Sequence, residues 1–483
     1  MMTGQYPGKH GVYHYHHRDG HRERVISSLD VAAETMWGAL TKLGRRVAVV
    51  GVPVTYPPAT INGVMVSGVP MPPGVHGEPR DVAEQLSLEV PAYPASASGA
   101  DWGRIFRVRG PGALVRHLER SFDISANAVL QVWRREAWDA FLCVFCELDR
   151  VQHLMPWPED PARRGAERQR ALLTRCYEKA DRVVGELVAA FGTDVTVALV
   201  SDHGFGENRR TFYLNRWLAD QGWLAMKPGG DVRLRLRRVT LDRVLGAVGL
   251  EVGGLFGGAP VWLPRIERWR LMESIDWSRT RAFGATADLD GVYINVSGRE
   301  PRGIVEPGEE YEDVRDALIR TLVEIRDPDT GQHMVVWARR REEVFHGPFV
   351  ERAPDIMYMT SGNRYPESGR LDAAPAIGAL GGRAGGHRLE GIFVLAGPAA
   401  RACHSLGECR IVDVAPTLLH VIGLPIADDL DGRVLLTALN DEFIQQRPVA
   451  FRKASTAVAS EAGEYSAEEQ RALEEQLRGL GYM

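Results

Sequence analysis

The chain alternates short apolar runs with segments that have the period of an amphipathic helix, and this alternation is its most constraining feature. Apolar runs typical of buried strands cover residues 45–52, 141–148, 195–201, 356–359 and 391–397. Helical patterns cover about 32–43, part of 162–191, and 412–422. Repeated strand and helix units with nearly continuous apolar strands favour an α/β fold. The predicted fold class is α/β with a mostly parallel central sheet and helices on both faces.

One part of the chain departs from this alternation. Residues 228–272 combine an Arg-Leu alternation with an apolar, Gly-rich patch that contains Trp262. A mobile cap over a functional site and a packed surface subdomain fit this segment equally well. Contact of the patch with lipid is a weaker alternative, because the flanks form no sustained basic amphipathic helix. The chain of 483 residues is long enough for a large core together with such an insertion.

The C-terminal segment carries the signals of one more helix. Ser466 and Glu469 form a capping-box pattern after a linker rich in Ala, Ser and Glu. Leu473 and Leu477 are four residues apart and share one helix face, so we expect this helix to dock on the domain. The predicted organisation is a first part of the core over 1–227, an insertion or cap over 228–272, a second part of the core over 273–445, and a linker with the C-terminal helix over 446–483.

Composition and charge disfavour several partners. The formal net charge of −5 provides no basic field for non-specific binding of nucleic acid. The sequence contains no run of about 18 apolar residues, so no membrane span is expected. The odd number of cysteines, five, favours free thiols in a reducing compartment over a zinc or redox pair. These features predict a cytoplasmic location.

Potential metal ligands lie at the ends of the predicted strands. Asp149 and His153 follow the run that ends at 148, and Asp202 and His203 follow the run that ends at 201. His387 lies in a Gly-rich loop before the run that begins at 391. In an open parallel sheet, groups beyond the carboxyl ends of different strands converge at one edge. Carboxylate and imidazole groups suit zinc or manganese, and their convergence favours a two-metal hydrolase.

Each of these patterns is weak when it is taken alone. Asp149 and His153 form the kind of pair that more often lies on a surface or caps a helix. Asp202 and His203 are adjacent, and both reach one ion only if the backbone turns sharply at the glycines that follow. His387 alone is typical of an ordinary loop histidine. The prediction therefore depends on their conjunction at one edge of the sheet.

Further polar residues invite roles of their own. Arg383 and Arg388 flank His387, and bidentate phosphate contacts and an ordinary surface position are equally compatible with them. Asn215 and Trp217 are expected to pack and cap. A group of N-terminal histidines resembles a metal cluster, although a solvated loop is favoured; it comprises His10, His14, His16, His17 and His21. Caps and turns are expected for three aspartates: Asp413, Asp429 and Asp431.

Several segments together resemble one known family. They are TGQYPGKHGVY from Thr3, VPVTYPP from Val52, ELDRVQH ending at His153, VSDHGFG from Val200, APDIMYM from Ala353, GGHRLEGIFVLAGP from Gly385, and IVDVAPTLLHVIGLPIADDLDGRVL from Ile411. The chain resembles, nearly end to end, the type I phosphodiesterase/nucleotide pyrophosphatase branch of the alkaline phosphatase superfamily. The DHG, GxHRxxGIF and DxAPTLLxxxGLPxxxDxDG patterns are specific in combination.

The resemblance implies a division of the ligands between two divalent ions. Asp149, His153 and His387 would bind one ion, and Asp202 and His203 would bind the other. In the family, a further Asp on the first strand completes the second site, and a Thr or Ser hydroxyl is the nucleophile.

Both of these family positions would precede Met1, and so would the first strand of the sheet. We therefore expect the chain as written to be poorly stable and to have little hydrolase activity. Export is also left open, because an upstream segment can hold a signal peptide.

The predicted function is metal-dependent hydrolysis of a small phosphate ester, a phosphodiester or a phosphomonoester, through a phospho-enzyme. Sulfate-ester hydrolysis and phosphosugar mutase action within the same superfamily are alternatives. A non-catalytic relative of the hydrolases, retained for binding, is a third possibility. The residues around 228–272 give no chemical constraint on the substrate.

Overall fold

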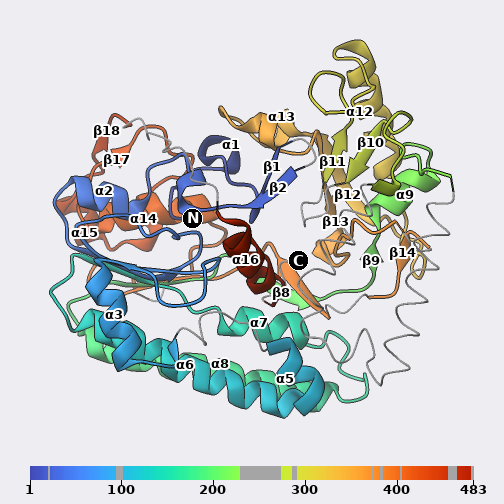
Figure 1. Ribbon diagram of the computed structural model, residues 1–483. Coiled ribbons are helices and arrows are strands. Elements are labelled where there is room, and N and C mark those ends of the chain that lie inside the picture. Colours follow the sequence, from blue (N-terminus) through green and yellow to red (C-terminus); the bar gives the residue numbers. More distant parts are fainter. Residues whose placement is uncertain are drawn as a thin grey trace.

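The computed structural model describes residues 1–19, 22–93, 102–228, 273–284, 291–371, 375–380, 384–402, 405–454 and 465–479. The chain forms a mixed α/β fold with two four-stranded sheets and several two-stranded ones (Figure 1). Most of the predicted 228–272 insertion lies outside the described residues. None of the described helices is long and apolar enough to cross a membrane.

The first four-stranded sheet has the order β5-β4-β3-β6. Its strands are β3 (Val47–Val52), β4 (Gly63–Ser67), β5 (Gly77–Glu78) and β6 (Ala140–Cys143). β3 pairs in parallel with β4 and β6, and β5 pairs antiparallel with β4. Val47 and Val49 pack into one hydrophobic core, and Ala48 and Val50 pack into another, because successive side chains of a strand point to opposite faces. Both faces of β3 are therefore buried, as its continuous apolar run predicts.

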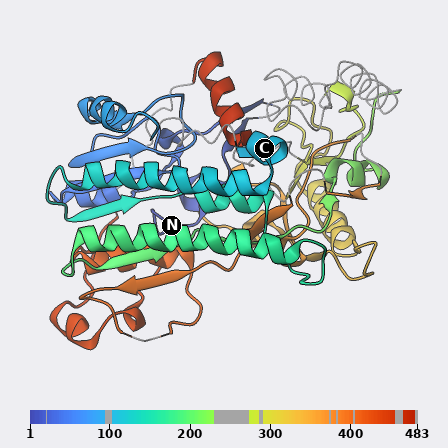
Figure 2. The same ribbon diagram turned by 90° about the horizontal axis from the view of Figure 1, so that it is seen from below.

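Helices cover both faces of this sheet (Figure 2). One face packs on α3 (Arg80–Glu89), α5 (Trp102–Arg109), α6 (Pro111–Trp133) and α8 (Ala166–Phe191). The other face packs on α2 (Met36–Lys42) and α14 (Val414–Val421). The helices expected at 32–43, within 162–191 and at 412–422 correspond to α2, α8 and α14. The layered arrangement of helices on a sheet is thus confirmed for this part of the chain.

The strands that follow pair antiparallel. They are β7 (Val197–Val200) with β16 (Phe393–Ala396), β8 (Gly204–Glu207) with β15 (Gly385–Arg388), and β9 (Thr211–Phe212) with β14 (Ile377–Gly378). A mostly parallel central sheet is therefore not confirmed, since the described parallel pairs are limited to β3 with β4 and β6, and β17 (Ile426–Ala427) with β18 (Phe451–Arg452). Apolar runs indicate burial, but they do not specify strand direction.

The second four-stranded sheet is antiparallel and has the order β10-β11-β13-β12. Its strands are β10 (Ala282–Gly284), β11 (Gly291–Ile294), β12 (Val335–Arg340) and β13 (Ile356–Thr360). It shares a core with α9 (Leu214–Asp220) and α12 (Glu309–Leu322), and α13 (Arg341–Val344) follows β12. The strand expected at 356–359 corresponds to β13.

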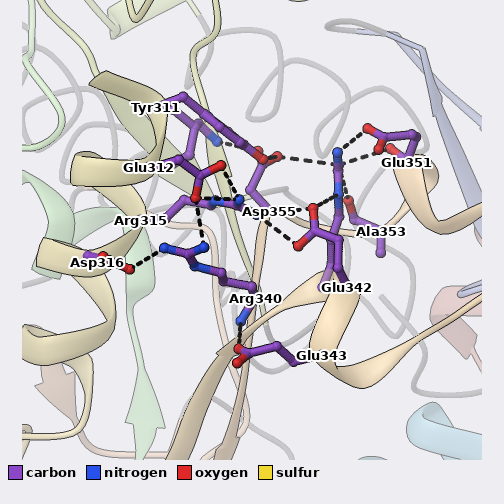
Figure 3. Close-up of polar contacts among 12 residues, drawn as sticks. Tyr311, Glu312, Arg315, Asp316, Arg340, Glu342, Glu343, Glu351, Ala353 and Asp355 are labelled. Atoms are coloured by element: carbon purple, nitrogen blue, oxygen red, sulfur yellow. Dashed lines mark hydrogen bonds and ion pairs between the residues drawn. The ribbon is translucent and has the colours of Figure 1, made fainter. Parts of the chain in front are cut away.

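A buried carboxylate ties this second sheet to its helices (Figure 3). Asp355 is fully buried, and it accepts hydrogen bonds from the Arg299 guanidinium, the Tyr311 hydroxyl at 2.6 Å and the Ile294 amide at 2.7 Å. Arg341 lies 3.3 Å from the same carboxylate. Burial alone would raise the pKa of Asp355, but Arg299 and Arg341 lower it. The charge is therefore fully compensated inside the fold.

The C-terminal helix lies beside the N-terminal part of the chain (Figure 1). The N-terminal part contains α1 (Pro7–His10) and the hairpin of β1 (His16–Asp19) with β2 (Arg22–Val25). The C-terminal helix α16 (Ala467–Gly479) packs Leu473 and Leu477 against Val25. Its predicted capping box is present, because Ser466 Oγ accepts from the Glu469 amide and the Glu469 carboxylate accepts from the Ser466 amide. Docking of this helix is confirmed.

Short elements complete the fold. α7 (Glu147–Leu154) follows β6, and α15 (Asp441–Gln446) precedes β18. The strand expected at 141–148 is shorter than predicted, since β6 ends at Cys143 and Cys146 is the N-cap residue of α7. Cys143, Cys146, Cys176 and Cys409 are free thiols, and burial raises the pKa of Cys143 and Cys146 to about 12. Single-turn 3-10 helices cover Ser28–Asp30, Val350–Arg352, Ser361–Asn363, Ile411–Asp413 and Leu436–Ala438.

Candidate metal centre

Helix α7 presents two of the predicted ligands on one face. Asp149 lies in its first turn and His153 in its last, four residues apart, so both side chains point to the same side of the helix. The helix packs through Val151 against the core under β3. It also contacts both β8 and β15.

The pair of β8 with β15 brings two further ligands to this helix. His203 directly precedes β8, and His387 lies on β15 opposite Phe205. His387 was expected in a loop before the next strand, and this expectation is wrong: the glycines around it form a strand. A Cβ at Gly385 would lie 2.0 Å from the Gln152 carbonyl oxygen, so glycine permits the close approach of β15 to α7.

Three of the predicted ligands converge on a fourth, the Asp149 carboxylate. His387 Nε2 lies 3.4 Å from Asp149 Oδ1, and the Nε2 atoms of His153 and His203 each lie 3.7 Å from it. The Nε2 atoms of His153 and His387 are 3.2 Å apart. Ligand atoms of Asp149, His203 and His387 all lie within 4.8 Å of one another, a spacing that suits a single metal ion.

Backbone carbonyl groups orient two of the imidazoles. His153 Nδ1 lies 3.3 Å from the Gly385 carbonyl oxygen, and His203 Nδ1 lies 3.2 Å from that of Gly204. A hydrogen bond at Nδ1 leaves Nε2 as the ligating nitrogen, which is the usual arrangement around metal-bound histidines. Burial and then the neighbouring His387 lower the pKa of His203, which favours the neutral form that ligation requires.

The Asp149 carboxylate is the strongest sign of a cation at this position. Its side chain is 16% exposed, and neither oxygen accepts a hydrogen bond. Burial alone would raise the pKa of Asp149, but the adjacent His387, His153 and His203 lower it. A buried carboxylate normally has a charged partner or a hydrogen-bond donor, and a divalent ion among the imidazoles would supply the missing charge. The donor set suits zinc or manganese.

Asp202 differs from the other predicted ligands in its exposure. Its side chain is 65% exposed, and Oδ2 lies 3.6 Å from His203 Nε2. The α-amino group of Met1 lies near enough to Asp202 for the two charges to interact. Asp202 therefore lies at the outer rim of the cluster formed by Asp149, His153, His203 and His387.

Phe205 occupies a position that the sequence patterns did not single out. Its ring lies edge-on to His153, His203 and His387, with ring centroids at 4.9, 5.6 and 5.1 Å. It therefore provides an apolar wall that fixes three imidazoles at once. The only signal in the sequence is its place two residues after His203, within the strand that pairs with His387.

A cavity of about 460 Å³ opens beside His153 and His387. Its lining combines the N-terminal segment with the segment after β13 and includes Tyr13, His14, Tyr15, Asn208, Asn363, Tyr365 and Glu367. None of these residues was predicted as a site residue, although Tyr13 closes the TGQYPGKHGVY segment and His14 belongs to the group of N-terminal histidines. The mixed aromatic and polar lining suits the organic part of a small ester.

The structure describes only one of the two arginines that flank His387 in the sequence. Arg388 donates hydrogen bonds to the carbonyl oxygens of Asn363, Gly386 and Glu207. Its guanidinium thus holds the pair of β8 with β15 in place, and binding of phosphate would require these bonds to break. Arg383 lies outside the described residues.

The solvated loop expected for the N-terminal histidines is wrong for His14 and His16. His14 lines the cavity beside the metal ligands, and its ring stacks on that of His16, with centroids 5.9 Å apart. His16 is 9% exposed and lies on β1. His17 also lies on β1, His10 ends α1, and His21 lies outside the described residues. The alternation of Tyr and His therefore lines the cavity up to Tyr15 and continues into β1 at His16.

The residues expected to pack, cap or turn do so. Asn215 is buried and exchanges hydrogen bonds with Gly284, while Trp217 lies in the core of the second sheet. Asp413 accepts hydrogen bonds from the amides of Arg410 and Arg433. Asp431 and Asp429 accept hydrogen bonds from the N-terminal segment. Asp431 accepts from the Tyr6 amide, and Asp429 accepts from the Gln5 side chain.

The cluster of one aspartate and three histidines beside a cavity could hold a metal ion, and it lies in a mixed α/β fold. Residues 1–382 match the family model of the type I phosphodiesterases/nucleotide pyrophosphatases, and the chain belongs to this family of phosphoric ester hydrolases. A solved structure of human ectonucleotide pyrophosphatase/phosphodiesterase 5 is similar, with 13% sequence identity, a TM-score of 0.45, and coverage of 91% of this chain and 86% of that chain. No curated protein matches the sequence.

Proposed function

We propose that this protein is a phosphodiesterase that uses two divalent metal ions, zinc or alternatively manganese. The proposed ligands are Asp149, His153, Asp202, His203 and His387. One observation carries the proposal: both oxygens of the Asp149 carboxylate lack a hydrogen bond, although three imidazole nitrogens lie within 3.7 Å of one of them. A cation is the simplest partner for this group of donors.

The side chains of the proposed centre have distinct roles. Bound divalent ions supply positive charge that polarises a phosphoryl group and lowers the pKa of an attacking hydroxyl. His153 and His203 keep their Nε2 atoms directed at the centre through contacts with the backbone carbonyls of Gly385 and Gly204. Phe205 excludes water from one side of the imidazoles. The adjacent cavity would hold the organic group of the ester.

The finer points of the proposal come from the family resemblance. A phospho-enzyme requires a nucleophile, for which the resemblance implies a Thr or Ser hydroxyl. A small phosphate ester as substrate fits the family. A cytoplasmic location stays a prediction, which the four free thiols support.

Metal content tests the proposal without depending on turnover. We expect wild-type protein exchanged into zinc to retain the ion through gel filtration. His387→Ala and Asp149→Ala should retain far less, because each removes a ligand from the centre. Loss of one ligand or its support commonly weakens metal affinity roughly 10- to 100-fold. Elemental mass spectrometry gives the zinc content, circular dichroism checks the fold, and hydrolysis of bis(p-nitrophenyl) phosphate reports activity.

His333→Ala is the matched control, because this imidazole contacts the Val323 carbonyl and Arg326 away from the centre. Asp202→Ala tests the rim position in the same way. Unchanged zinc content in folded His387→Ala protein would contradict the proposed ligand set. Zinc retention without hydrolysis of any phosphate ester would contradict the proposed reaction.

A further inference from the structure

A second cavity lies at the other end of the parallel strands. Its volume is about 470 Å³, and its lining consists of Arg45, His420, Ile422, Gly423, Leu424, Arg447, Pro448 and Ala450. Arg45 precedes β3, whereas Asp149 follows β6, and β3 and β6 are parallel. The second cavity and the metal centre are therefore at opposite ends of the sheet, as the positions of α14 and α15 relative to α7 and β8 also show (Figure 1).

Arg447 contributes a positive charge that the fold does not neutralise. Its guanidinium lies 5.2 Å from the centroid of the Phe443 ring, and its one hydrogen bond, to the Val421 carbonyl, is long at 3.4 Å. Among the described residues, no carboxylate forms an ion pair with it. A guanidinium used only as a helix cap would be expected to make a shorter bond, of about 2.7–3.2 Å. Most of its donors are thus available to a ligand.

Two further side chains add donors around the same space. His420 is 3% exposed, its Nε2 has no hydrogen bond, and its ring packs edge-on against Phe443. Burial and then the charge of Arg447 lower the pKa of His420, which keeps it neutral with one N–H to donate. Arg45 is 43% exposed and forms one ion pair, with Asp139 at 3.2 Å, that leaves other donors of its fork open.

We propose that this cavity binds a tetrahedral oxyanion, a phosphate or sulfate group, with Arg447 as the principal ligand and Arg45 and His420 as supporting donors. Guanidinium groups match such oxygens in a bidentate fashion, and a partly enclosed cavity strengthens the attraction. The oxyanion is either free inorganic phosphate or the phosphate of a monoester. The site is separate from the metal centre, so the proposal is independent of the proposed hydrolysis.

Calorimetric titration of metal-free protein with inorganic phosphate tests the site, because removal of metal silences phosphate binding at the metal centre. We expect one binding site in wild-type protein and in His387→Ala protein. Arg447→Gln should weaken binding at least about tenfold, through loss of charge-assisted hydrogen bonds. Arg401→Gln is the matched control, since Arg401 is a half-buried arginine paired with Asp441, the first residue of α15, and it should bind as wild type does.

A parallel titration with adenosine monophosphate separates the two sources of the oxyanion. Tighter binding of the nucleotide than of phosphate identifies a monoester as the ligand, and equal or weaker binding identifies free phosphate. Either result supports the site if Arg447→Gln abolishes the observed binding. Arg447→Lys, which keeps the charge but lacks the fork, should give an intermediate affinity and serves if Arg447→Gln fails to fold. Absence of phosphate binding to wild-type protein, or equal binding by folded Arg447→Gln, would overturn the inference.

Discussion

Glu147 is a buried carboxylate directly behind the metal ligands. It is 3% exposed, and its Oε1 accepts hydrogen bonds from the hydroxyls of Ser121 at 3.0 Å and Ser125 at 2.8 Å. Both serines belong to α6, so these bonds tie the first turn of α7 to its neighbouring helix. Glu147 thus acts as a positioning residue for Asp149 and His153.

Glu147→Ala should lower the free energy of unfolding by about 1–3 kcal/mol, because the buried Ser121 hydroxyl and the partly buried Ser125 hydroxyl lose their acceptor. We also expect weaker zinc binding, since the ligand helix loses its anchor. Chemical denaturation and competition with a chelator measure the two effects. Glu147→Gln keeps an acceptor oxygen and should retain most of the zinc affinity. Equal zinc affinity of Glu147→Ala and wild-type protein would show that α7 is fixed without this carboxylate.

His10 makes stability depend on pH. Burial first, and then the nearby α-amino group of Met1, lower its pKa from the ordinary 6.5 to about 4. Its Nδ1 accepts a hydrogen bond from the Val12 amide at 3.3 Å, which also requires the neutral ring. Because the unfolded chain takes up the proton first, stability falls as pH drops from about 6.5 to about 4.

His10→Gln should therefore show a shallower loss of stability over that range. The difference between the two proteins should be roughly 2 kcal/mol or less at pH 4, after allowance for partial exposure of the ring. Urea denaturation at several pH values measures it, and the two curves should converge above pH 7. Parallel curves across the whole range would mean that His10 has an ordinary pKa.

At the level of elements, the docking of α16 depends on two leucines. Leu473 and Leu477 are fully buried against Val25, and the Gln476 side chain accepts a hydrogen bond from the Met71 amide at 2.8 Å. The helix therefore closes over the N-terminal hairpin of β1 and β2, which leads into the cavity beside the metal centre.

Leu477→Ala should weaken this docking by about 2–5 kcal/mol, because it leaves a cavity at a fully buried position. Hydrogen exchange of α16 amides should become faster, while exchange in β3 and β4 stays slow. Arg471→Ala on the exposed face of the same helix is the control and should change little. Equal protection of α16 in both variants would show that other contacts hold the helix.

The pairing of elements marks the limit of what could be predicted from sequence. The apolar run at 45–52 predicted a buried strand, and the capping box at Ser466 predicted a helix start, because both signals are local. His387 could not be assigned to a strand, since a run of glycines is typical of a loop until its partner β8 is known. Tyr15 and Glu367 line the same cavity only because of the tertiary fold, and no local sequence pattern indicates that they lie close to it.

For the molecule as a whole, β7 and β16 pair Leu199 with Val394, and these side chains are 41% and 49% exposed. Apolar residues of a central strand pair are normally buried. The Met1 amino group lies near Asp202, at the rim of the metal centre.

The glycines of β8 and β15 limit which substitutions the metal centre tolerates. A Cβ at Gly204 would lie 2.0 Å from the Glu390 carbonyl oxygen, and one at Gly386 would lie 2.5 Å from Asn208 Oδ1. Ordinary side chains cannot enter this seam without spreading the two strands. Replacing an imidazole removes one ligand, whereas replacing Gly204 would push β8 against the backbone at Glu390 and shift His203 relative to His387. Mutational tolerance should thus be lower at these glycines than at the ligands' own neighbours on α7.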